Sequence, residues 1–401
     1  MIQSYIIDAI RTPVGKFNGS LSSVRPDDLA AQVIRTLVSR NPKLDPKFID
    51  DVILGNANGA GEENRNVARM AGLLAGLPVT VPGETVNRLC SSGMASVINA
   101  SRAIKSSELN IVIAGGVENM TRAPFVLSKA SSPFGKDVQL FDTSIGWRFV
   151  NPKLKEMYGV DAMGETAENV AEMYKISRED QDLMAFNSQM KAAKAQKDGI
   201  FEKEIDPVYI PQKKGEPIKF DKDEFIRPET TLEGLAKLQP AFRKGGTVTA
   251  GNASGLNDGA AAILMSSANS IKEFDLVPRA RVVSSAVVGV EPRIMGIGPV
   301  EASRKALKNA GLSFDDMSVI ELNEAFAAQG LACIRELGLT DNDPRINPNG
   351  GSIAIGHPLG MSGSRLIITA LNQLERTNGQ YALCTMCIGV GQGYAIIIEK
   401  L

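Results

Sequence analysis

The sequence has little of several residue types on which common enzyme classes depend. Its 401 residues include a single histidine, His357, which excludes catalysis by several histidines and histidine-rich metal sites. Four cysteines are too few for a disulfide framework, and free thiols are typical of a reducing compartment. Only Cys384 and Cys387 have the spacing of a zinc-ligand pair, and a second pair is missing. We therefore expect no structural metal.

An excess of charge and long apolar runs are also missing. The 44 Lys and Arg residues nearly balance the 45 Asp and Glu residues, so nothing in the charge favours nucleic acid or an acidic membrane surface as a partner. No apolar run approaches the roughly 20 residues that span a bilayer. Residues 1–8 lack the basic region of a signal peptide. A folded cytoplasmic protein is the expectation.

Strand-like and helix-like segments alternate over the first 125 residues and again from about residue 279 onward. Apolar, β-branched runs at 2–7, 52–54 and 110–116 predict strands, and helical spacing at 27–39 and 67–75 predicts helices. This alternation favours an α/β fold with a parallel sheet covered on both faces.

Residues 124–248 differ in composition from the rest of the chain, because charged and polar residues are more frequent there. Ser177 is a good N-cap for a helix that runs to about Lys197. We expect the segment to be an insertion of loops and helices. The predicted division is an N-terminal half at 1–123, the insertion at 124–248, a return to the first half at 249–270, and a C-terminal half at 271–401.

The sequence contains a weak internal repeat. Three residues recur 267 positions later: Val52, Ile53 and Asn56 correspond to Val319, Ile320 and Asn323. At the same offset Cys90 corresponds to His357. Since the repeated segments share a strand-then-Asn context, we interpret the chain as two duplicated α/β halves. Two equivalent strand-to-helix turns that face each other would bring Cys90 and His357 together.

Cys90 and His357 are the first candidates for chemistry. Cys90 precedes small residues that open a predicted helix, where the positive end of the helix dipole favours a thiolate. Its alternative is a buried structural cysteine. His357 lies in a glycine-rich turn, whose backbone freedom is costly unless close approach or unusual φ is needed. We favour a catalytic role over that of an ordinary buried or surface histidine.

Two further motifs can assist a thiolate. Cys384 and Cys387 form a C-x-x-C followed by glycines, which fits a redox motif or a nucleotide loop less well than a reactive Cys beside exposed backbone N–H groups. Asn323 ends an apolar strand, where it can hold a water or a carbonyl oxygen or simply cap a helix. Walker A, Gly-x-Ser-x-Gly and His-Glu-x-x-His motifs are absent, so phosphoryl transfer, serine hydrolysis and metalloprotease chemistry lose support.

Taken together, these segments resemble the thiolase family over essentially the whole chain. The similar motifs are 87–93 around Cys90, 323–327 from Asn323, 356–358 around His357 and 387–391 from Cys387, with further matches at 163–170 and 249–255. Within the family, residues 141–152 and 383–393 look most like the β-ketoadipyl-CoA thiolases. One departure is Ala162, where acetoacetyl-CoA-type biosynthetic thiolases usually have histidine.

The resemblance implies an α/β fold of two duplicated halves, with mixed five-stranded sheets in an αβαβα arrangement and a loop insertion. It implies an acyltransferase that cleaves 3-oxoacyl-CoA with CoA to acetyl-CoA and a shortened acyl-CoA, the expected substrate being 3-oxoadipyl-CoA. This would place the enzyme in the breakdown of aromatic compounds. A general acetoacetyl-CoA thiolase or a 3-ketoacyl-CoA thiolase of fatty-acid metabolism is the alternative.

The resemblance also implies a role for each site residue. Cys90 is the nucleophile, His357 its base, and Cys387 the acid and base for the acetyl-CoA carbanion. His357 with a water on Asn323 would form one oxyanion site, and the backbone N–H groups of Cys90 and Gly389 the other. CoA serves as a substrate rather than a bound cofactor. Its expected contacts are Ser254, Arg227, Phe242, Met163 and Ala250.

Three expectations remain. Arg148, beside Trp147 in the insertion, is our candidate to bind a substrate carboxylate. Family resemblance implies a homodimer or homotetramer. Two rivals are a decarboxylating ketoacyl synthase, which needs a second His or an Asn partner, and a non-catalytic lipid-transfer relative, which would not need both Cys90 and Cys387.

Overall fold

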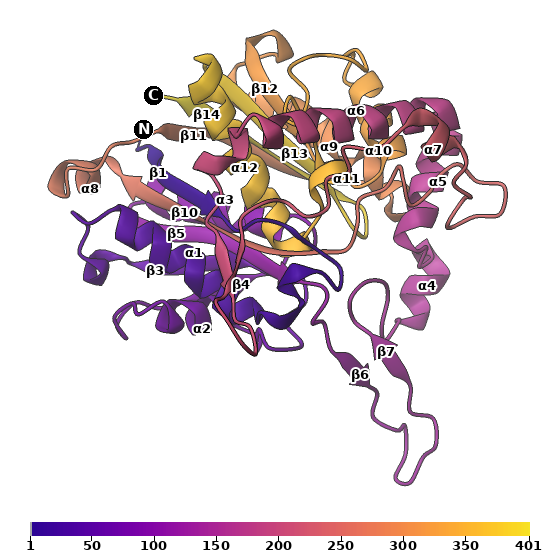
Figure 1. Ribbon diagram of the computed structural model, residues 1–401, viewed down its shortest axis with the longest axis horizontal. Coiled ribbons are helices and arrows are strands. Elements are labelled where there is room, and N and C mark those ends of the chain that lie inside the picture. The colour runs from indigo at the N-terminus through magenta and orange to yellow at the C-terminus, as the bar shows by residue number, and fades with distance from the viewer. Residues whose placement is uncertain (1) are drawn as a thin grey trace.

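The computed structural model describes residues 2–401, and one large mixed sheet runs through both halves of the chain (Figure 1). The strand order is β12-β13-β14-β11-β1-β10-β5-β3-β4, with β2 paired to β10. The strands of this sheet are β1 (Ser4–Arg11), β2 (Gly15–Lys16), β3 (Asp51–Gly55), β4 (Glu84–Val86), β5 (Ile111–Asn119), β10 (Asn257–Ser267), β11 (Ala280–Gly289), β12 (Met317–Leu322), β13 (Tyr381–Ile388) and β14 (Gln392–Lys400).

Helices cover the sheet, and two small hairpins stand outside it. The helices are α1 (Pro26–Arg40), α2 (Val67–Leu74), α3 (Ser92–Lys105), α4 (Pro152–Tyr158), α5 (Met163–Met173), α6 (Arg178–Lys197), α7 (Leu232–Ala236), α8 (Ala268–Glu273), α9 (Gly298–Ala310), α10 (Ala327–Glu336), α11 (Ser352–Ile355) and α12 (Leu359–Thr377). The hairpins pair β6 (Phe125–Leu127) with β7 (Leu140–Asp142), and β8 (Val208–Ile210) with β9 (Ile218–Phe220).

Each half of the chain contributes one side of the sheet. The N-terminal half supplies β1, β10, β5, β3 and β4, and the C-terminal half supplies β11, β14, β13 and β12. The two sides meet where Tyr5 and Ile6 of β1 pair with Arg281 and Ala280 of β11. The α/β architecture of two related halves is therefore confirmed.

The sheet differs from the expectation in two details. The alternating pattern predicted a parallel sheet, but β10 is antiparallel to both β5 and β1, which gives the mixed sheet that the resemblance implies. The insertion returns the chain to the end of the sheet where β5 stops, since Asp258 pairs with Asn119. On the C-terminal side four strands are present rather than five. A single parallel bridge between Ile320 and Ile346 stands where a fifth strand would pair with β12.

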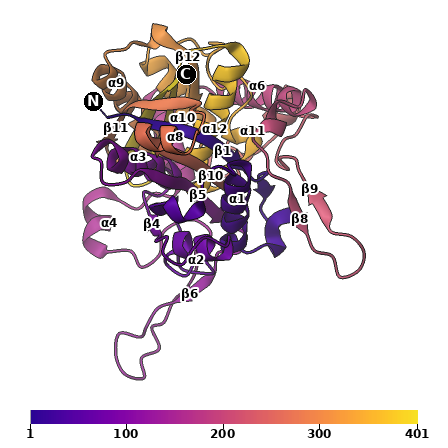
Figure 2. The same ribbon diagram turned by 90° about the vertical axis from the view of Figure 1, so that its left-hand side faces the viewer.

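Helices α3 and α12 form a central layer between the strands of the N-terminal half and those of the C-terminal half (Figure 2). Met94 and Ile98 of α3 share one buried cluster with Leu366 and Leu371 of α12, together with apolar residues of β5 and β13. Helices α1 and α2 pack on the outer face of the N-terminal side, and α9 and α10 on that of the C-terminal side. This is the layered αβαβα order that the resemblance implies.

The two central helices begin at equivalent places in the repeat. Helix α3 starts at Ser92 and α12 at Leu359, which differ by the same 267 positions that separate Cys90 from His357. Their first turns are in close contact, since a Cβ on Gly93 would lie 2.5 Å from the carbonyl oxygen of Gly360. The duplication inferred from a few identities is therefore present in the structure, and it places the two turns against each other.

The insertion leaves the body of the molecule in two places. The β6–β7 hairpin projects at one end in Figure 1, and the β8–β9 hairpin projects in Figure 2. Helix α6 begins and ends as predicted, with the Ser177 hydroxyl accepting a hydrogen bond of 3.0 Å from the Asp180 N–H. The limits of the four predicted domain segments stay a prediction.

A fully buried arginine fastens the insertion to the first half. Arg11 of β1 donates two hydrogen bonds to the Asp223 carboxylate, at 2.7 and 2.9 Å, and one to Glu204 at 2.7 Å. These two acids raise the pKa of Arg11 against the lowering effect of burial, so the arginine stays charged. Removing one partner of such a buried set costs about 3–5 kcal/mol, so the network fixes the insertion relative to β1.

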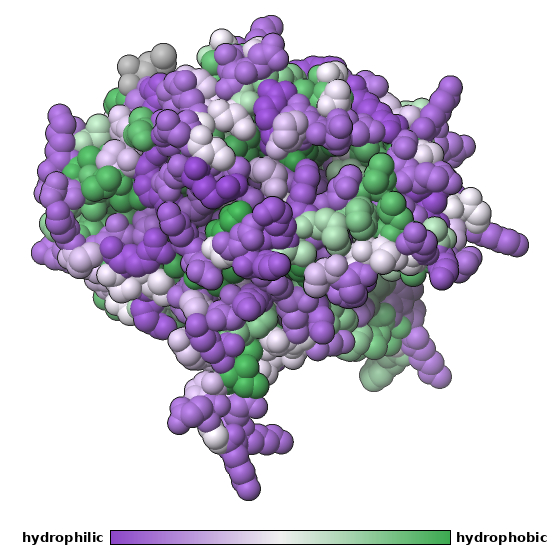
Figure 3. Space-filling model, turned by 45° about the horizontal axis from the view of Figure 1, so that its top comes forward, coloured by the Kyte–Doolittle hydropathy of each residue, from purple (hydrophilic) through white to green (hydrophobic). Residues whose placement is uncertain are grey.

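The projecting β6–β7 hairpin carries several exposed apolar side chains. Phe125, Leu127, Phe134 and Leu140 are each at least 63% exposed, whereas the face seen in Figure 3 is largely hydrophilic, with small apolar patches. None of the helices within residues 2–401 is both long and apolar enough to cross a membrane.

Candidate active site

Cys90 lies in a tight turn between β4 and α3. Leu89, the residue before it, has φ of +47°, a left-handed conformation that is uncommon for a non-glycine residue and that sites under constraint often use. Ser92 holds the turn, because its hydroxyl donates to the Leu89 carbonyl at 2.6 Å and accepts from the Arg88 N–H at 2.9 Å. The turn therefore places the Cys90 side chain at the start of α3.

The electrostatics of Cys90 differ from the simple expectation of a dipole-stabilised thiolate. Burial raises the pKa of the Cys90 thiol, and the nearby Glu118 carboxyl adds to this. Hydrogen bonds from the backbone N–H groups of Gly389 and of Cys90 itself act in the opposite direction but are smaller in effect. A nucleophilic role for this residue therefore requires a base that takes the thiol proton.

A cavity of about 380 Å³ opens over Cys90. Its lining comes from both halves and from the insertion: Leu89, Cys90 and Glu118 from the first half, Gly389 and Val390 from the β13–β14 turn, and Trp147, Arg148 and Met163 from the insertion. Burial raises the pKa of Glu118 to about 7, although its carboxylate accepts backbone N–H groups of Ala57 and Gly360 at 2.9 and 2.8 Å. The cavity thus places the Cys90 thiol beside a mostly apolar pocket.

His357 occupies the turn before α12 and is 5% exposed. Gly356 precedes it with φ of +109°, and a Cβ there would lie 2.5 Å from the Asn257 side chain, so only glycine fits. The Asn257 Oδ1 accepts the His357 backbone N–H at 2.9 Å. Burial, assisted by the charge of Arg365, lowers the pKa of His357 to about 3, so the imidazole is neutral at pH 7.

The hydrogen bonds of His357 define its tautomer. The Ser362 hydroxyl donates to the Pro358 carbonyl at 2.8 Å, and its oxygen lies 2.6 Å from His357 Nδ1. Because that hydroxyl proton is already used, Nδ1 must carry the proton and donate to Ser362. The Nε2 atom is then unprotonated, which is the form that can accept a proton from a thiol.

Asn323 lies against the free nitrogen of His357. Its Nδ2 is 3.4 Å from Nε2, and its Oδ1 accepts the Ser352 hydroxyl at 2.6 Å. Arg365 Nη2 donates to the same Ser352 oxygen at 3.0 Å, so the hydroxyl proton must point to Asn323. Arg365, 1% exposed, therefore sets the Asn323 amide through Ser352.

Cys387 is the last residue but one of β13, beside the same region, and is 1% exposed. Burial raises the pKa of its thiol well above the usual range, and the proximity of Cys90 raises it further. The side chain packs in a small buried cluster with Met163, Ala325 and Phe326. Cys384 points into the central core instead, which separates the two cysteines of the C-x-x-C pair.

The residues expected to contact CoA are spread from the cavity to the surface. Met163 lines the cavity, and Ser254 donates to the Ala325 carbonyl through both its N–H and its hydroxyl, each at 3.0 Å. Phe242 packs edge-on against Phe326 with ring centroids 6.2 Å apart. Arg227 and Ala250 are exposed and do not line the cavity.

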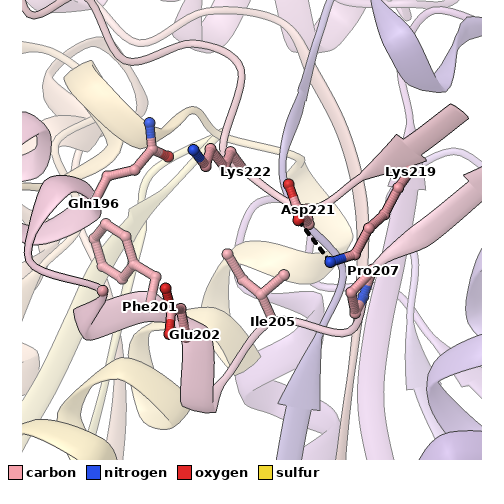
Figure 4. Close-up of a pocket in the computed structure, with 9 residues that line it drawn as sticks. Gln196, Phe201, Glu202, Ile205, Pro207, Lys219, Asp221 and Lys222 are labelled. Carbon is pink, nitrogen blue, oxygen red and sulfur yellow. Dashed lines mark ion pairs between the residues drawn. The ribbon is translucent and has the colours of Figure 1, made fainter.

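A second hollow of about 390 Å³ lies between the end of α6 and the β8–β9 hairpin (Figure 4). Its charged groups include Lys219 and Asp221, which pair at 2.9 Å, together with Glu202 and Lys222. It contains neither a thiol nor the histidine, so it has no group suited to nucleophilic acyl chemistry. Among residues 2–401 no cluster of three or more His, Cys, Asp or Glu could hold a metal ion.

Sequence reasoning missed five residues that support the site, namely Glu118, Asn257, Ser352, Ser362 and Arg365. A weak signal existed for two of them. Glu118 is a carboxylate inside an otherwise apolar strand, and Arg365 is a charge on a helix that is buried along most of its length. The serines and Asn257 carry no distinguishing pattern, because their role depends on contacts between distant segments.

Comparison with known proteins agrees with this architecture. The model of the thiolase N-terminal domain matches residues 4–269, and that of the thiolase C-terminal domain matches residues 276–400. A β-ketoadipyl-CoA thiolase of Acinetobacter baylyi is 59% identical, and a 3-oxoadipyl-CoA/3-oxo-5,6-dehydrosuberyl-CoA thiolase of Escherichia coli is 60% identical, each over 401 residues and 100% of both chains.

Solved structures show the same fold. The human mitochondrial 3-ketoacyl-CoA thiolase superposes with a TM-score of 0.93 at 41% identity, covering 100% of this chain and 99% of that one. The acetyl-CoA acetyltransferase of Bacillus anthracis gives the same TM-score at 40% identity and the same coverage. The chain therefore belongs to the thiolase family of acyltransferases.

Proposed function

We propose that this thiolase cleaves 3-oxoadipyl-CoA with CoA, giving acetyl-CoA and succinyl-CoA through an acyl-enzyme on Cys90. The observation that carries the proposal is the Cys90 thiol, which lies in a cavity and receives backbone N–H groups of Gly389 and Cys90. These donors fit an oxyanion formed at a carbonyl carbon that Cys90 attacks.

In the first step His357 Nε2 takes the Cys90 proton, and the sulfur attacks the 3-oxo carbon. The neutral imidazole and its Nδ1–H bond to Ser362 support this direction of transfer. The oxyanion is stabilised by the N–H groups of Cys90 and Gly389, and each such donor is typically worth about 3–4 kcal/mol in the transition state.

The second step breaks the bond between carbons 2 and 3 of the substrate. The electron pair passes to the acetyl-CoA fragment as an enolate, whose oxygen faces His357 Nε2–H and a water on Asn323. Cys387 then gives its proton to carbon 2 and releases acetyl-CoA. The raised pKa of the Cys387 thiol keeps it protonated until this moment.

The third step returns the enzyme to its starting state. His357 passes its proton to the Cys387 thiolate and then takes the proton from the thiol of a second CoA, which attacks the succinyl group on Cys90. Succinyl-CoA leaves, and the Cys90 thiolate recovers its proton from His357. In this account Cys90, His357, Cys387, Asn323 and Gly389 act directly on the reacting atoms.

The proposed substrate is supported by the relatives and by the cavity. The relatives from Acinetobacter baylyi and Escherichia coli are named for β-ketoadipyl-CoA and 3-oxoadipyl-CoA. Ala162 lines the cavity where biosynthetic acetoacetyl-CoA thiolases usually carry histidine, which leaves room for a longer acyl chain. This favours 3-oxoadipyl-CoA over acetoacetyl-CoA or a fatty-acid substrate, and a place in the breakdown of aromatic compounds.

CoA is proposed as a substrate that lies between the cavity and the insertion. Met163 and Phe242 would form apolar walls, Ser254 and Ala250 would face the pantetheine arm, and Arg227 would contact the nucleotide. Arg227 makes no ion pair within the described chain and stacks 5.0 Å over the Phe225 ring. Its guanidinium is thus available for a phosphate rather than being engaged as a surface salt bridge.

The proposal extends to a cytoplasmic homodimer or homotetramer. The exposed Phe125, Leu127, Phe134 and Leu140 of the projecting hairpin are apolar surface that association would cover. Light scattering coupled to size exclusion tests this part, and a monomer at micromolar concentration would contradict it.

Steady-state thiolysis by the purified protein tests the substrate. We expect kcat/KM for 3-oxoadipyl-CoA to exceed that for acetoacetyl-CoA, followed by loss of the 3-oxoacyl-CoA or by product mass. A preference for acetoacetyl-CoA would make the chain a general acetyl-CoA acetyltransferase. No cleavage of either would favour a non-catalytic relative.

The roles of the two thiols are tested by an exchange assay. Cys387→Ala removes the proton donor for carbon 2 but leaves acyl transfer between CoA and Cys90. We therefore expect the variant to exchange labelled CoA with succinyl-CoA while thiolysis falls by about 10²–10⁴. Equal loss of both activities would contradict the assignment of Cys387.

A further inference from the structure

The charge distribution of the Cys90 cavity identifies a binding site for the far end of the acyl chain. Two charged residue types line the cavity: the arginine Arg148 and the glutamate Glu118. We propose that Arg148, oriented by Asn58, binds the distal carboxylate of a dicarboxylic acyl group attached to Cys90. This inference rests on the proposed function and names the residue that selects its substrate class.

Contacts between two distant segments fix the direction of Arg148. Its Nη2 donates to Asn58 Oδ1 at 3.3 Å. The Asn58 amide cannot reverse, because its Nδ2 donates to both the carbonyl and the hydroxyl of Thr143, each at 3.0 Å. Thr143 is itself buried and donates to the Pro124 carbonyl at 2.5 Å. The guanidinium is therefore held by a side chain of the N-terminal half.

The other hydrogen-bond donors of Arg148 have no partner within the described chain. Arg148 makes no ion pair with any acid of residues 2–401, whereas Arg122 and Arg293 are each paired with a carboxylate. Its Nε and Nη1 atoms have no hydrogen-bond partner in this part of the chain. A guanidinium with free, adjacent donors is suited to bind a carboxylate with two hydrogen bonds.

Glu118 does not neutralise this site. Its carboxyl oxygens accept the backbone N–H groups of Ala57, Asn58 and Gly360, so their hydrogen-bonding capacity is used by the backbone. It also accepts no hydrogen bond from Arg148. The cavity thus presents one unpaired cation together with apolar surface from Leu89, Met120 and Ile145.

The chemistry of the acyl group matches this lining. A succinyl group on Cys90 carries its carboxylate three carbon–carbon bonds beyond the acyl carbon, with two methylenes between them. The methylenes suit the apolar lining, and the carboxylate requires a cation because an unpaired charge is costly in such surroundings. A methyl-ended chain of equal length leaves Arg148 desolvated without a partner.

Substitution of Arg148 tests the proposal with a matched pair of substrates, 3-oxoadipyl-CoA and 3-oxohexanoyl-CoA, which differ only at the chain end. We expect Arg148→Gln to lower the ratio of their kcat/KM values about ten- to a hundredfold, mainly through KM for the dicarboxylic substrate. Arg148→Lys should retain part of the preference. Lys129→Gln, which removes a charge from the exposed hairpin, should leave the ratio unchanged.

The outcomes separate this inference from the proposed function. If wild-type protein cleaves neither substrate, the proposed function fails. If it prefers 3-oxoadipyl-CoA but Arg148→Gln keeps that preference, or lowers both kcat/KM values equally, only the inference is overturned.

A measurement without variants covers the case in which Arg148→Gln does not fold. Succinyl-CoA and butyryl-CoA differ by the same charged end, and each can be tested as an inhibitor of acetoacetyl-CoA thiolysis by the wild-type enzyme. We expect succinyl-CoA to inhibit at least tenfold more tightly and its advantage to shrink with added salt. Equal inhibition constants would overturn the proposal.

Discussion

The two strand-to-helix turns of this chain occupy equivalent positions in a duplicated fold but have different surroundings. Both carry a positive φ just before the reactive residue, +47° at Leu89 and +109° at Gly356, and both lead into a central helix. The first opens to a cavity and presents a thiol. The second is closed, and each nitrogen of its imidazole has a neighbour within 3.4 Å.

The two turns differ because one gives a substrate access to a side chain and the other fixes the orientation of a side chain. In the proposed mechanism the nucleophile must meet a substrate; the Cys90 turn lies at the cavity wall, and burial raises the pKa of its thiol. The proposed base must have a defined tautomer, and His357 is surrounded by Ser362, Asn323 and Asn257. The same backbone geometry supports both tasks because the helix starts bring the turns into contact.

Removing the thiol from the open turn should have the largest effect. Cys90→Ala abolishes the covalent step, and we expect thiolysis to fall by at least about 10³ while the fold is unchanged. The measurement is kcat/KM for 3-oxoadipyl-CoA with circular dichroism of the folded state. Cys333→Ser is the matched control, since burial raises the pKa of that thiol to about 12 and it lies in the outer layer of the C-terminal half. Substantial thiolysis by Cys90→Ala would show that the nucleophile lies elsewhere.

Substituting His357 in the closed turn should reduce the reactivity of the Cys90 thiol in the open turn. His357→Asn removes the base, and because the Cys90 pKa is raised, we expect thiolysis to fall by about 10²–10⁴. Alkylation of Cys90 by iodoacetamide at pH 7 should slow as well. The double variant with Cys90→Ala should be no worse than Cys90→Ala alone, because the two residues act as a unit. Unchanged alkylation would contradict the pairing of the two turns.

The two turns also differ in their response to acid. The unfolded chain binds a proton at His357 near pH 6.5, but the folded chain does so only near pH 3, because burial lowers that pKa. The contribution of neutral His357 to the free energy of unfolding is therefore complete above pH 6.5. It is lost as pH falls toward 3, by up to about 1.4 kcal/mol per pH unit. Urea unfolding at pH 6.5, 5.5 and 4.5 should show a smaller loss for His357→Asn than for wild type. If both proteins lost the same free energy of unfolding, His357 would not be held in its neutral form by burial.

The smallest expected effect concerns the residues behind the closed turn. Ser352→Ala breaks the link from Arg365 to Asn323, so the Asn323 amide loses its fixed direction. We expect kcat to fall about tenfold with little change in KM, since a net hydrogen bond is worth about 1 kcal/mol. Ser352→Thr, which retains the hydroxyl, should recover most of the activity. If the alanine variant changed only thermal stability, Ser352 would have a structural role alone.

Local pattern and motif predicted much of the fold and the central residues of the site. The repeat at Val52 and Val319 located the two halves, and the N-cap at Ser177 located α6. The parallel arrangement was wrong because the direction of β10 depends on the path of the insertion, which no local pattern contains. The tautomer of His357 depends on Ser362 and Pro358 within the folded turn, and the raised Cys90 pKa on burial, so neither could be predicted from the sequence.

In the proposed mechanism the Cys90 turn carries the acyl group and the His357 turn supplies the base. The most direct measurement mixes the enzyme with 3-oxoadipyl-CoA in the absence of free CoA, quenches with acid, and maps the modified peptide by mass spectrometry. We predict one succinyl group per chain, on Cys90, with release of acetyl-CoA. An unmodified chain, or a succinyl group on Cys387, would contradict it.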